Sequence, residues 1–539
     1  MGRCFGIDLG TTNTVISFRD SKGKIKRIGD KNGENCIKTA ILFESADNYC
    51  IGSRALSMQG VLAAPALCTE FKPRIKGENY YLTATDGTEL KLKPVKAMNL
   101  FLNKLLKEYI EPALGRYFDD PELTADDRVV VTVPVKFNPE EKKAIKQAAL
   151  KANYPNLRIV FEPTAAAVAI TEGADRVRLN EDDVIAVYDL GGGTFDISVI
   201  AKKENGVYYP LDKGQDGDKT LGGNLISRRI ITGLLADELE AAGVYVSDET
   251  DDDDFDFDPD EYGVDNYTEY MMNWLNLKEL ADEIKETFSD EEYDSCEFST
   301  RLYLHGEEIA FEVSLTKEQY HRCIYDIIEK TVDITERVIS ETEDANGVKI
   351  TKLILAGGSS QIALIKEMFE ERFDEDRIQV ISSHKPFDLI SIGALILGEK
   401  ETDLSAEEKT VSQFGVAEKR GMAVVFTPLI YEDKRLPVRG ERQFEISEEI
   451  YKSGEISVRF YEKDVRSYHD ALIIGRDEGL YKIAEYDIPI EKDVKPRTVS
   501  ISFIIEEDGT ISLEADFMDS AGNTIRKVSD RKDSETNLW

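Results

Sequence analysis

The tripeptide DLG occurs twice in this chain, at residues 8–10 and 189–191. Each copy follows a short apolar run and precedes a segment of alternating apolar and polar residues, which predicts strand, turn and strand. One such motif is weak support, because many hairpins turn on Asp and Gly. Two copies in matching contexts predict a duplicated domain, with a phosphate and its metal ion held between the two halves.

The second copy continues with two more glycines, so that residues 191–193 are all Gly. Glycine weakens a strand, and three in a row therefore predict a tight turn whose bare backbone amides closely approach a ligand. Successive amides of this kind bind anions, while the flanking carboxylates of Asp189 and Asp196 suit a hydrated metal ion. In the first copy Thr11 and Thr12 occupy the turn, and their hydroxyls can hold phosphate oxygens.

The composition excludes several classes of partner. The chain has 539 residues, 41% of them hydrophobic, and a net charge of −37. Such acidity opposes binding to nucleic acid and to anionic lipid, because both interactions need Lys and Arg. No apolar run reaches the length of a membrane span and no signal peptide precedes the first strand, so we expect no membrane partner. Six cysteines without a Cys-x-x-Cys pair indicate reduced thiols and a cytoplasmic protein.

Changes of pattern divide the chain into several regions. Residues 1–397 alternate strand-like and helix-like segments, which predicts an α/β domain, and residues 413–522 show the short alternating strands of an all-β sandwich. The composition turns polar in a linker at 398–412 and in a tail at 523–539. The acidic segment at 245–268 is predicted to be a surface loop, because it is too charged to pack. A calcium or basic-partner site is the alternative there, although the EF-hand spacing is absent.

Six segments in order resemble one known family. They read GIDLGTTNTVIS, VPVKFNPEEKKA, FEPTAAAVA, YDLGGGTFDISVI, TLGGN and LAGGSSQI, and the chain has no P-loop or Gly-x-Gly-x-x-Gly motif. Together they resemble the seventy-kilodalton heat-shock chaperones (DnaK-like), within the superfamily that includes actin and the sugar kinases. The resemblance implies a duplicated actin-like ATPase domain of two lobes, followed by a β-sandwich that binds peptides. Because the sequence stops after the sandwich segment, we expect a form that lacks the family's helical lid.

The resemblance also implies roles for individual residues. Asp8 and Asp189 would hold Mg²⁺ through water, and Asp196 would help to hold K⁺. Lys72 would orient the attacking water beside the γ-phosphate. The implied catalytic residues are Lys72, Glu162, Asp189 and Thr194. The implied contacts to ATP or ADP are Gly10, Thr11, Thr12, Asn13, Gly191, Gly192, Gly193, Gly222, Gly223, Asp282, Lys285, Ser289, Gly357, Gly358 and Ser359.

Some of these residues also have ordinary structural interpretations. Lys72 by itself resembles any surface lysine, and Glu162 before a proline could simply begin a helix. The base side departs from the family, because Glu286 and Gln361 stand where arginines usually stack on adenine. Losing two stacking guanidinium groups predicts weaker nucleotide binding or a looser base preference. The linker departs from the family as well. Its polar composition predicts that the linker docks weakly on the ATPase domain and that ATP binding is weakly coupled to peptide binding by the sandwich.

The expected function is that of an ATP-dependent chaperone which binds unfolded or extended polypeptides. By resemblance its partners are a J-domain co-chaperone and a nucleotide exchange factor. The alternative is a nucleotide-sensing module with a dedicated protein partner and little turnover, and a sugar kinase fits the sandwich poorly. Four apolar residues are candidates for the peptide groove, although they could equally be ordinary sandwich core: Val416, Met422, Ile456 and Val458.

Overall fold

The structure is a computed structural model of the chain. It describes residues 2–31, 33–57, 64–118, 122–173, 184–202, 207–246, 267–290, 292–373, 377–382, 386–400, 409–410, 412–420, 423–463, 480–490, 496–506 and 510–529. Most of the predicted acidic loop and most of the predicted linker therefore lie outside the described residues, and so does Met422. Within the described ranges, no helix is both long and apolar enough to span a bilayer.

The first lobe is built on a mixed sheet with the strand order β11–β10–β1–β2–β3. The strands β1 (Cys4–Leu9), β2 (Asn13–Arg19) and β3 (Ile25–Ile28) are antiparallel neighbours, and the first DLG motif ends β1. β10 (Arg128–Val133) and β11 (Leu157–Phe161) extend the sheet in parallel from β1. β10 ends directly before Pro134, which cannot donate to a strand ladder.

The second lobe repeats this sheet with the order β18–β17–β12–β13–β14. β12 (Val184–Leu190), β13 (Phe195–Lys202) and β14 (Tyr208–Asp218) are antiparallel neighbours. β17 (Ile350–Ala356) and β18 (Gln379–Ser382) extend the sheet in parallel from β12. Strand order and directions match those of the first sheet one by one, so the duplication predicted from the two DLG motifs is present in the sheet topology.

Two helices pack between these sheets, and one of them is rich in alanine. α5 (Glu162–Glu172) follows β11, and α12 (Pro386–Glu399) lies against β1, β2 and β10. Their closest approach is at Gly393, where an added Cβ would lie 1.7 Å from the carbonyl oxygen of Ala165. The alanines of α5 allow this close contact, and one apolar cluster contains residues of both helices and both sheets.

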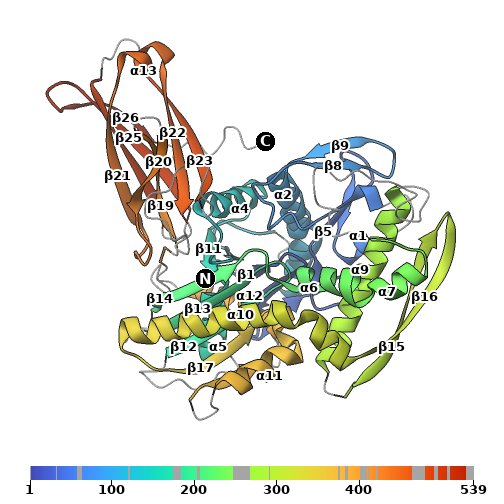
Figure 1. The fold of residues 1–539 in the computed structure, drawn as a ribbon. Helices are drawn as coiled ribbons and strands as arrows, with labels where there is room; N and C mark the ends of the chain where they lie inside the picture. Colours follow the sequence, from blue (N-terminus) through green and yellow to red (C-terminus); the bar gives the residue numbers. More distant parts are fainter. Residues whose placement is uncertain are drawn as a thin grey trace.

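The remaining elements of the lobes surround the two sheets (Figure 1). Those of the first lobe are β5 (Ala40–Phe43), β6 (Tyr49–Ile51), α1 (Ser53–Ser57), η1 (Ala64–Ala66), β7 (Leu67–Thr69), β8 (Tyr80–Thr83), β9 (Glu89–Leu92), α2 (Pro94–Leu105), η2 (Leu106–Ile110), α3 (Glu111–Tyr117) and α4 (Pro139–Lys151). The short strand β4 (Ile37–Lys38) belongs to the first sheet itself, where it pairs with β2. Those of the second lobe are α6 (Gly223–Arg229), η3 (Ile230–Leu234), α7 (Ala236–Ala241), α9 (Tyr267–Ser289), β15 (Ser295–Leu304), β16 (Glu307–Thr316), α10 (Lys317–Asn346), η5 (Gly358–Gln361) and α11 (Ala363–Arg372).

Local sequence explains where the two best-defined helices begin. Asn138 caps α4, because its side chain accepts from the backbone of Glu141, whose carboxylate accepts from the backbone of Asn138. Thr316 and Gln319 form the same reciprocal capping box on α10. Each box satisfies two backbone N–H groups that a helix start would otherwise leave without partners. α10 ends at Gly347, whose φ of 65° suits a residue without Cβ.

The C-terminal part is a sandwich of two four-stranded antiparallel sheets. One sheet contains β19 (Gln413–Arg420), β20 (Ala423–Ile430), β22 (Glu455–Lys463) and β23 (Leu480–Pro489). The other contains β21 (Val438–Glu445), β24 (Thr498–Ile505), β25 (Ile511–Met518) and β26 (Thr524–Ser529), and α13 (Glu448–Ser453) joins the sheets. A single apolar core fills the space between them, with Phe460 stacked on Phe503 at a centroid distance of 4.0 Å.

The structure differs from the predicted regions at two places. β26 lies inside the segment expected to be a polar tail, and it pairs with β25 as an edge strand. Its Arg and Lys side chains suit an edge strand, because charge on an edge opposes pairing with other chains. In the predicted linker, the described residues Lys409, Thr410 and Ser412 are buried, and α12 extends to Glu399.

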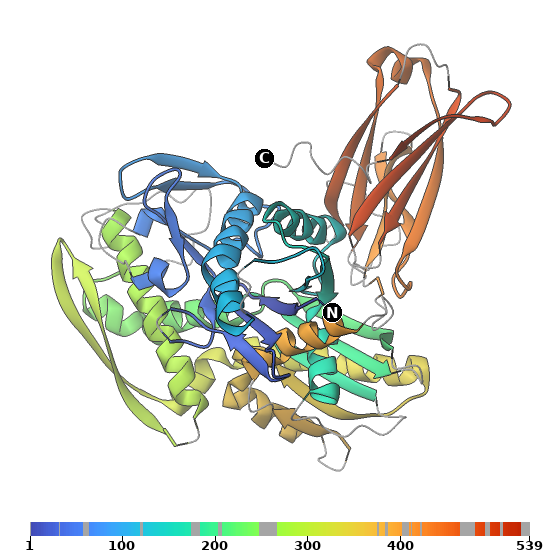
Figure 2. The same ribbon diagram turned by 180° about the vertical axis from the view of Figure 1, so that it is seen from behind.

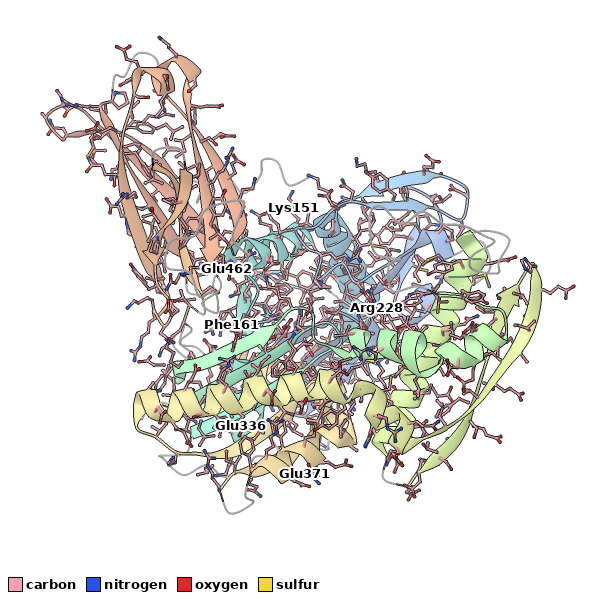
Figure 3. The ribbon with its side chains drawn as sticks, in the orientation of Figure 1. Lys151, Phe161, Arg228, Glu336, Glu371 and Glu462 are labelled. Atoms are coloured by element: carbon pink, nitrogen blue, oxygen red, sulfur yellow. The ribbon has the colours of Figure 1, made fainter. Side chains whose placement is uncertain are left out.

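The sandwich contacts the lobes beside α4 and β14 (Figures 1 and 2). The Tyr486 hydroxyl donates to Glu140 Oε1 of α4 at 3.0 Å, and the backbone N–H of Lys213 donates to Asp433 Oδ1 at 3.0 Å. Glu462 is buried at the end of the sandwich that faces α4 (Figure 3). Both of these hydrogen bonds between the sandwich and the lobes are polar contacts between side chains or backbone of the two parts.

Candidate functional site

The two glycine-containing turns that follow β1 and β12 meet face to face. A Cβ added to Gly192 would lie 2.5 Å from Thr12 Oγ1, and one added to Gly193 would lie 2.6 Å from Thr11 Oγ1. A side chain at either position would therefore force the facing threonine to move. The structure therefore brings together residues 10–13 and 191–193, as the sequence analysis predicts for a site held between two halves.

Two further glycine segments complete the floor of this site. The backbone N–H of Gly223 donates to the Gly191 carbonyl at 2.9 Å, so the turn before α6 lies on the triple-glycine turn. Gly357 ends β17 with a φ of 80°, and its missing Cβ would lie 2.5 Å from Asp189 Oδ1. A Cβ on Gly223 would lie 2.4 Å from Ser359 Oγ. Four segments distant in sequence thus pack against one another through their glycines.

Lys72 and Glu162 form a buried ion pair beside these turns. Lys72 Nζ lies 2.6 Å from Glu162 Oε1, with side-chain exposures of 3% and 7%. Lys72 comes from the turn after β7, and Glu162 is the first residue of α5. Neither Lys72 nor Glu162 is therefore an ordinary surface residue. Burying a charged group without a partner is costly, and here each residue is the partner of the other. The aromatic ring of Phe137 lies 5.9 Å from the ammonium group and covers it.

Three carboxylates lie close to this pair, and all have raised pKa values. Burial, with Glu162 adding to it, raises the pKa of Asp8 to about 7 against the opposing effect of Lys72. Burial and Glu162 also raise the pKa of Asp196 to about 7, although its Oδ1 accepts from the Lys136 backbone at 3.3 Å. Burial and the neighbouring acids raise the pKa of Asp189 well above its ordinary value.

This arrangement fits a cation bound together with phosphate. Among the described residues, nothing donates a hydrogen bond to the buried Oδ2 of Asp189 or pairs with the buried hydroxyl of Thr164. Several acidic groups buried near one lysine leave excess negative charge, which a divalent ion would neutralise. Over the same part of the chain, no three His, Cys, Asp or Glu side chains cluster as direct ligands. Mg²⁺ suits such a site because it usually keeps several water ligands.

A second polar cluster lies at the start of α6 and on the adjoining face of α9. Lys285 Nζ donates to Ser227 Oγ at 2.6 Å and to the Gly223 carbonyl at 3.1 Å. Asp282 accepts from Ser227 at 2.9 Å and pairs with Lys285 at 2.7 Å. Ser289 instead donates to the backbone of its own helix, at the carbonyl of Lys285. Two of the three predicted α9 contacts therefore lie together beside Gly223.

Comparison with known proteins identifies the family. A sequence model described as Hsp70 protein matches residues 4–537. The chain belongs to the Hsp70 family. It is 24% identical over 535 residues to the chaperone protein DnaK of Thermotoga petrophila, covering 98% of this chain and 80% of that protein. The DnaK of Thermosipho melanesiensis is equally similar, with 24% identity over 534 residues and the same shares of the two chains.

Membership places the site in a known chemical context. Hsp70 proteins are ATPases and chaperones, and they bind ATP or ADP with Mg²⁺. In this Hsp70-family chain, Glu286 is exposed on α9, and the exposed Gln361 donates to the Gly358 carbonyl at 3.4 Å. The two residues that stand in place of the family's stacking arginines thus lie at the surface of the second lobe.

The remaining predicted site residues fall into two groups. Asn13 and Thr194 lie in the facing turns: Asn13 Oδ1 accepts from the Cys36 thiol, and the Thr194 carbonyl accepts from the Gly191 N–H. Val416, Ile456 and Val458 lie in the sandwich core, with exposures of 1%, 8% and 6%. Their role in peptide binding stays a prediction.

Sequence reasoning overlooked three polar residues of this Hsp70-family chain. Lys136 positions Asp196 through its backbone and pairs with Asp216 at 2.7 Å. Glu70 and Asn224 meet across the cleft at 2.8 Å. Glu70 and Asn224 lie within two residues of Lys72 and Gly223, and Lys136 lies in the segment VPVKFNPEEKKA. Closeness in sequence to these predicted positions was the available signal.

Proposed function

We propose that this chain hydrolyses ATP and uses the nucleotide state to regulate binding of extended polypeptides by its sandwich. The buried Lys72–Glu162 pair carries the proposal, because it lies beside Asp8, Asp189 and Asp196 where the two glycine-containing turns meet. Phosphoryl transfer requires positioning and charge neutralisation more than covalent chemistry. The site contains groups that can position a water molecule and groups that can neutralise the charge of the phosphates.

Each residue has a task that follows from its position. Glu162 accepts a hydrogen bond from the ammonium group of Lys72, which fixes where the remaining N–H protons point. Lys72 orients the attacking water and stabilises negative charge as it develops. Asp8 and Asp189 would hold Mg²⁺ through water, and Asp196 would help to hold K⁺. The bound metal ion supplies charge neutralisation at the phosphates. The backbone N–H groups of residues 191–193 and the hydroxyls of Thr11 and Thr12 would hold phosphate oxygens.

The polar contacts between sandwich and lobes support coupling between the two parts. Glu140 lies on α4, whose capping residue Asn138 follows Lys136, and Lys136 holds Asp196. A short chain segment thus joins the candidate catalytic site to the sandwich surface. The clients would be unfolded or extended polypeptides, and the family resemblance implies a J-domain co-chaperone and an exchange factor as partners.

A nucleotide-sensing module with little turnover is the second candidate. The positions of Glu286 and Gln361 favour it, because neither side chain can stack on adenine as an arginine does. Weak base binding would suit a sensor of high nucleotide concentrations. The two candidates differ in whether bound ATP is converted to ADP.

Single-turnover hydrolysis of ATP tests the proposed activity. We expect the Lys72→Ala variant to bind ATP but to hydrolyse it at least about 100-fold more slowly, since it removes a charge that acts on the transition state. The exposed Lys91→Ala variant on β9 is the matched control and should hydrolyse ATP like the wild type. Equal rates in wild type and Lys72→Ala would contradict the ATPase proposal and favour the sensor.

Peptide release tests the proposed regulation. A fluorescent unfolded peptide is bound to the protein, and its dissociation is followed after addition of Mg-ATP or Mg-ADP. Faster release with ATP alone would support coupled chaperone action. Binding without any nucleotide effect would contradict coupling, and no peptide binding would favour a dedicated partner in place of general clients.

A further inference from the structure

Glu70 has an unfavourable backbone conformation next to the candidate catalytic lysine. It directly follows β7 and precedes Lys72 by two residues, and its φ is 57°. A residue with a Cβ is strained in this left-handed region, and such strain is usually retained where it serves a site. The preceding residue is held in place, because the Tyr80 hydroxyl donates to the Thr69 carbonyl at 2.9 Å.

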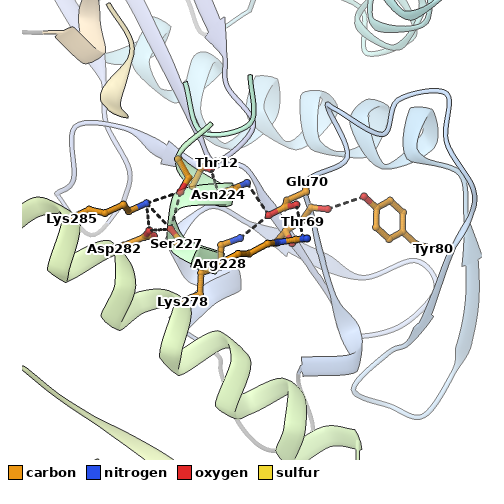
Figure 4. Close-up of polar contacts among 11 residues, drawn as sticks. Thr12, Thr69, Glu70, Tyr80, Asn224, Ser227, Arg228, Lys278, Asp282 and Lys285 are labelled. Carbon is orange, nitrogen blue, oxygen red and sulfur yellow. Dashed lines mark hydrogen bonds and ion pairs between the residues drawn. The ribbon is translucent and has the colours of Figure 1, made fainter. Parts of the chain in front are cut away.

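The Glu70 side chain reaches across the cleft to the second lobe (Figure 4). Its Oε1 accepts from Lys278 Nζ of α9 at 2.7 Å and from Asn224 Nδ2 of α6 at 2.8 Å. Its Oε2 lies 3.9 Å from an amino group of Arg228. One carboxylate of the first lobe thus contacts three donors from two helices of the second lobe.

Glu70 is charged in this environment. Burial raises its pKa, but Lys278, Arg228 and Arg74 outweigh that effect, and the resulting pKa lies below the ordinary value. Hydrogen bonds from charged or amide donors to a carboxylate are about twice as strong as neutral ones. The exposed fractions of Glu70 and Lys278 are 20% and 24%, so water and salt still compete with the pair.

Asn224 joins this contact to the turn that is predicted to hold phosphate. Its Oδ1 accepts from Thr12 Oγ1 at 3.3 Å, while its backbone N–H donates to the Gly192 carbonyl at 2.7 Å. A continuous path therefore runs from Glu70 through the Asn224 amide to Thr12. Displacing Glu70 would free one end of the amide that orients the Thr12 hydroxyl.

The two lobes do not pack tightly along the whole of α9. A cavity of about 460 Å³ lies between them, lined by Leu42 and Leu67 from the first lobe and by Met272, Asn276 and Tyr303 from the second. Residues on opposite walls of this cavity gain no packing energy from one another. Beside the cavity the lobes are joined by the contact of η1 with α9 and by the polar contacts of Glu70.

We propose that Glu70 is a positioning residue that closes the cleft by binding Lys278, Arg228 and Asn224 and thereby sets Lys72 and Thr12 against the nucleotide. This inference rests on the proposed ATP site and names how that site is held closed. Opening the contact would release nucleotide, and its partial exposure makes the release sensitive to salt.

The test measures dissociation of a fluorescent ADP analogue from the full chain with Mg²⁺ present. The variants are Glu70→Gln, which keeps the shape of the side chain, Lys278→Met and the double variant. We expect release to be about tenfold faster in each single variant. In the double variant the acceleration should be smaller than the product of the two single effects, because both substitutions break the same contact. Added salt should accelerate release from the wild type more than from Glu70→Gln. The exposed Glu283→Gln variant of α9 is the charge-matched control.

A second readout requires no nucleotide. Hydrogen exchange of the α6 and β7 amides in the ligand-free protein should be faster in Glu70→Gln than in the wild type or in Glu283→Gln. Unchanged nucleotide release together with unchanged exchange would overturn the inference and leave the ATPase proposal intact. If the wild type bound no nucleotide, the proposed function would fail, and the exchange comparison would still decide whether Glu70 closes the cleft.

Discussion

Single atoms decide which residues fit the two facing turns. Gly193 has Thr11 Oγ1, Cγ2 and Cβ all within 3.1 Å of the position that its own Cβ would take. Contacts under 3.0 Å force a neighbour to move, and protein interiors leave little room for such movement. The glycine at this position is therefore required by the opposite lobe, in addition to the local turn.

A glycine substitution tests this requirement. We expect Gly193→Ala to weaken nucleotide binding by about tenfold or more, because the added methyl group displaces Thr11 from its place in the turn. Gly191→Ala should cause a smaller loss, since its Cβ would meet only the Thr194 carbonyl oxygen, at 3.5 Å. Calorimetric titration with Mg-ADP gives both affinities, and circular dichroism checks that both variants fold. Equal losses would show that crowding between the turns does not matter.

At the scale of elements, α4 connects the site with the sandwich. It begins at the capping box of Asn138 and Glu141, directly after the loop that contains Lys136. Its side that faces the sandwich carries the buried Glu140, which accepts from Tyr486, and Lys143, whose ammonium group lies 5.9 Å from the centre of the Tyr486 ring. The first turn of α4 must therefore be well formed both to hold the loop that contains Lys136 and to contact Tyr486 of the sandwich.

Removal of the cap should loosen that first turn. We expect Asn138→Ala to destabilise the start of α4 by about 1 kcal/mol, because the backbone N–H of Glu141 loses its side-chain acceptor. Hydrogen exchange of the first α4 amides should then be about fivefold faster. The amides of α10, which has its own capping box, are the control in the same sample. Unchanged exchange in α4 would mean that tertiary contacts alone hold the helix start.

At the scale of the whole molecule, sandwich and lobes meet through charged and polar groups. Burial raises the pKa of Glu462, and the nearby Lys219 together with a hydrogen bond from Ser412 offsets only part of this effect. A carboxyl whose pKa is higher in the folded protein stabilises that state fully at pH below its unfolded pKa. The contribution is lost as the pH rises through the folded value.

The pH dependence of stability tests the role of Glu462. We expect Glu462→Gln to melt like the wild type near pH 4.5 and at a higher temperature than the wild type at pH 8, because the variant avoids a buried negative charge. Thermal melting between these pH values measures the difference. The exposed Glu455→Gln variant on the same strand should show no such trend. A difference that stays constant with pH would contradict this account of Glu462.

Much of the architecture could be predicted because the signals are local. Each DLG motif with its flanking strands specifies a hairpin through residues adjacent in sequence, and two such hairpins predicted the duplicated sheets. The cap at Asn138 and the alternation in β22, β24 and β25 belong to the same class. The Lys72–Glu162 pair was assigned only through the family pattern, since 90 residues separate its members.

The sequence alone determined the family, the repeated hairpins and the all-β character of the C-terminal part, because backbone periodicity and glycine turns depend on near neighbours. Tertiary structure decided which polar groups meet. Glu70 and Lys278 are 208 residues apart, and their contact exists only because two lobes close on each other. It also placed Val416, Ile456 and Val458 in the sandwich core and buried Lys409 and Thr410, since burial depends on what packs against a residue and not on its type.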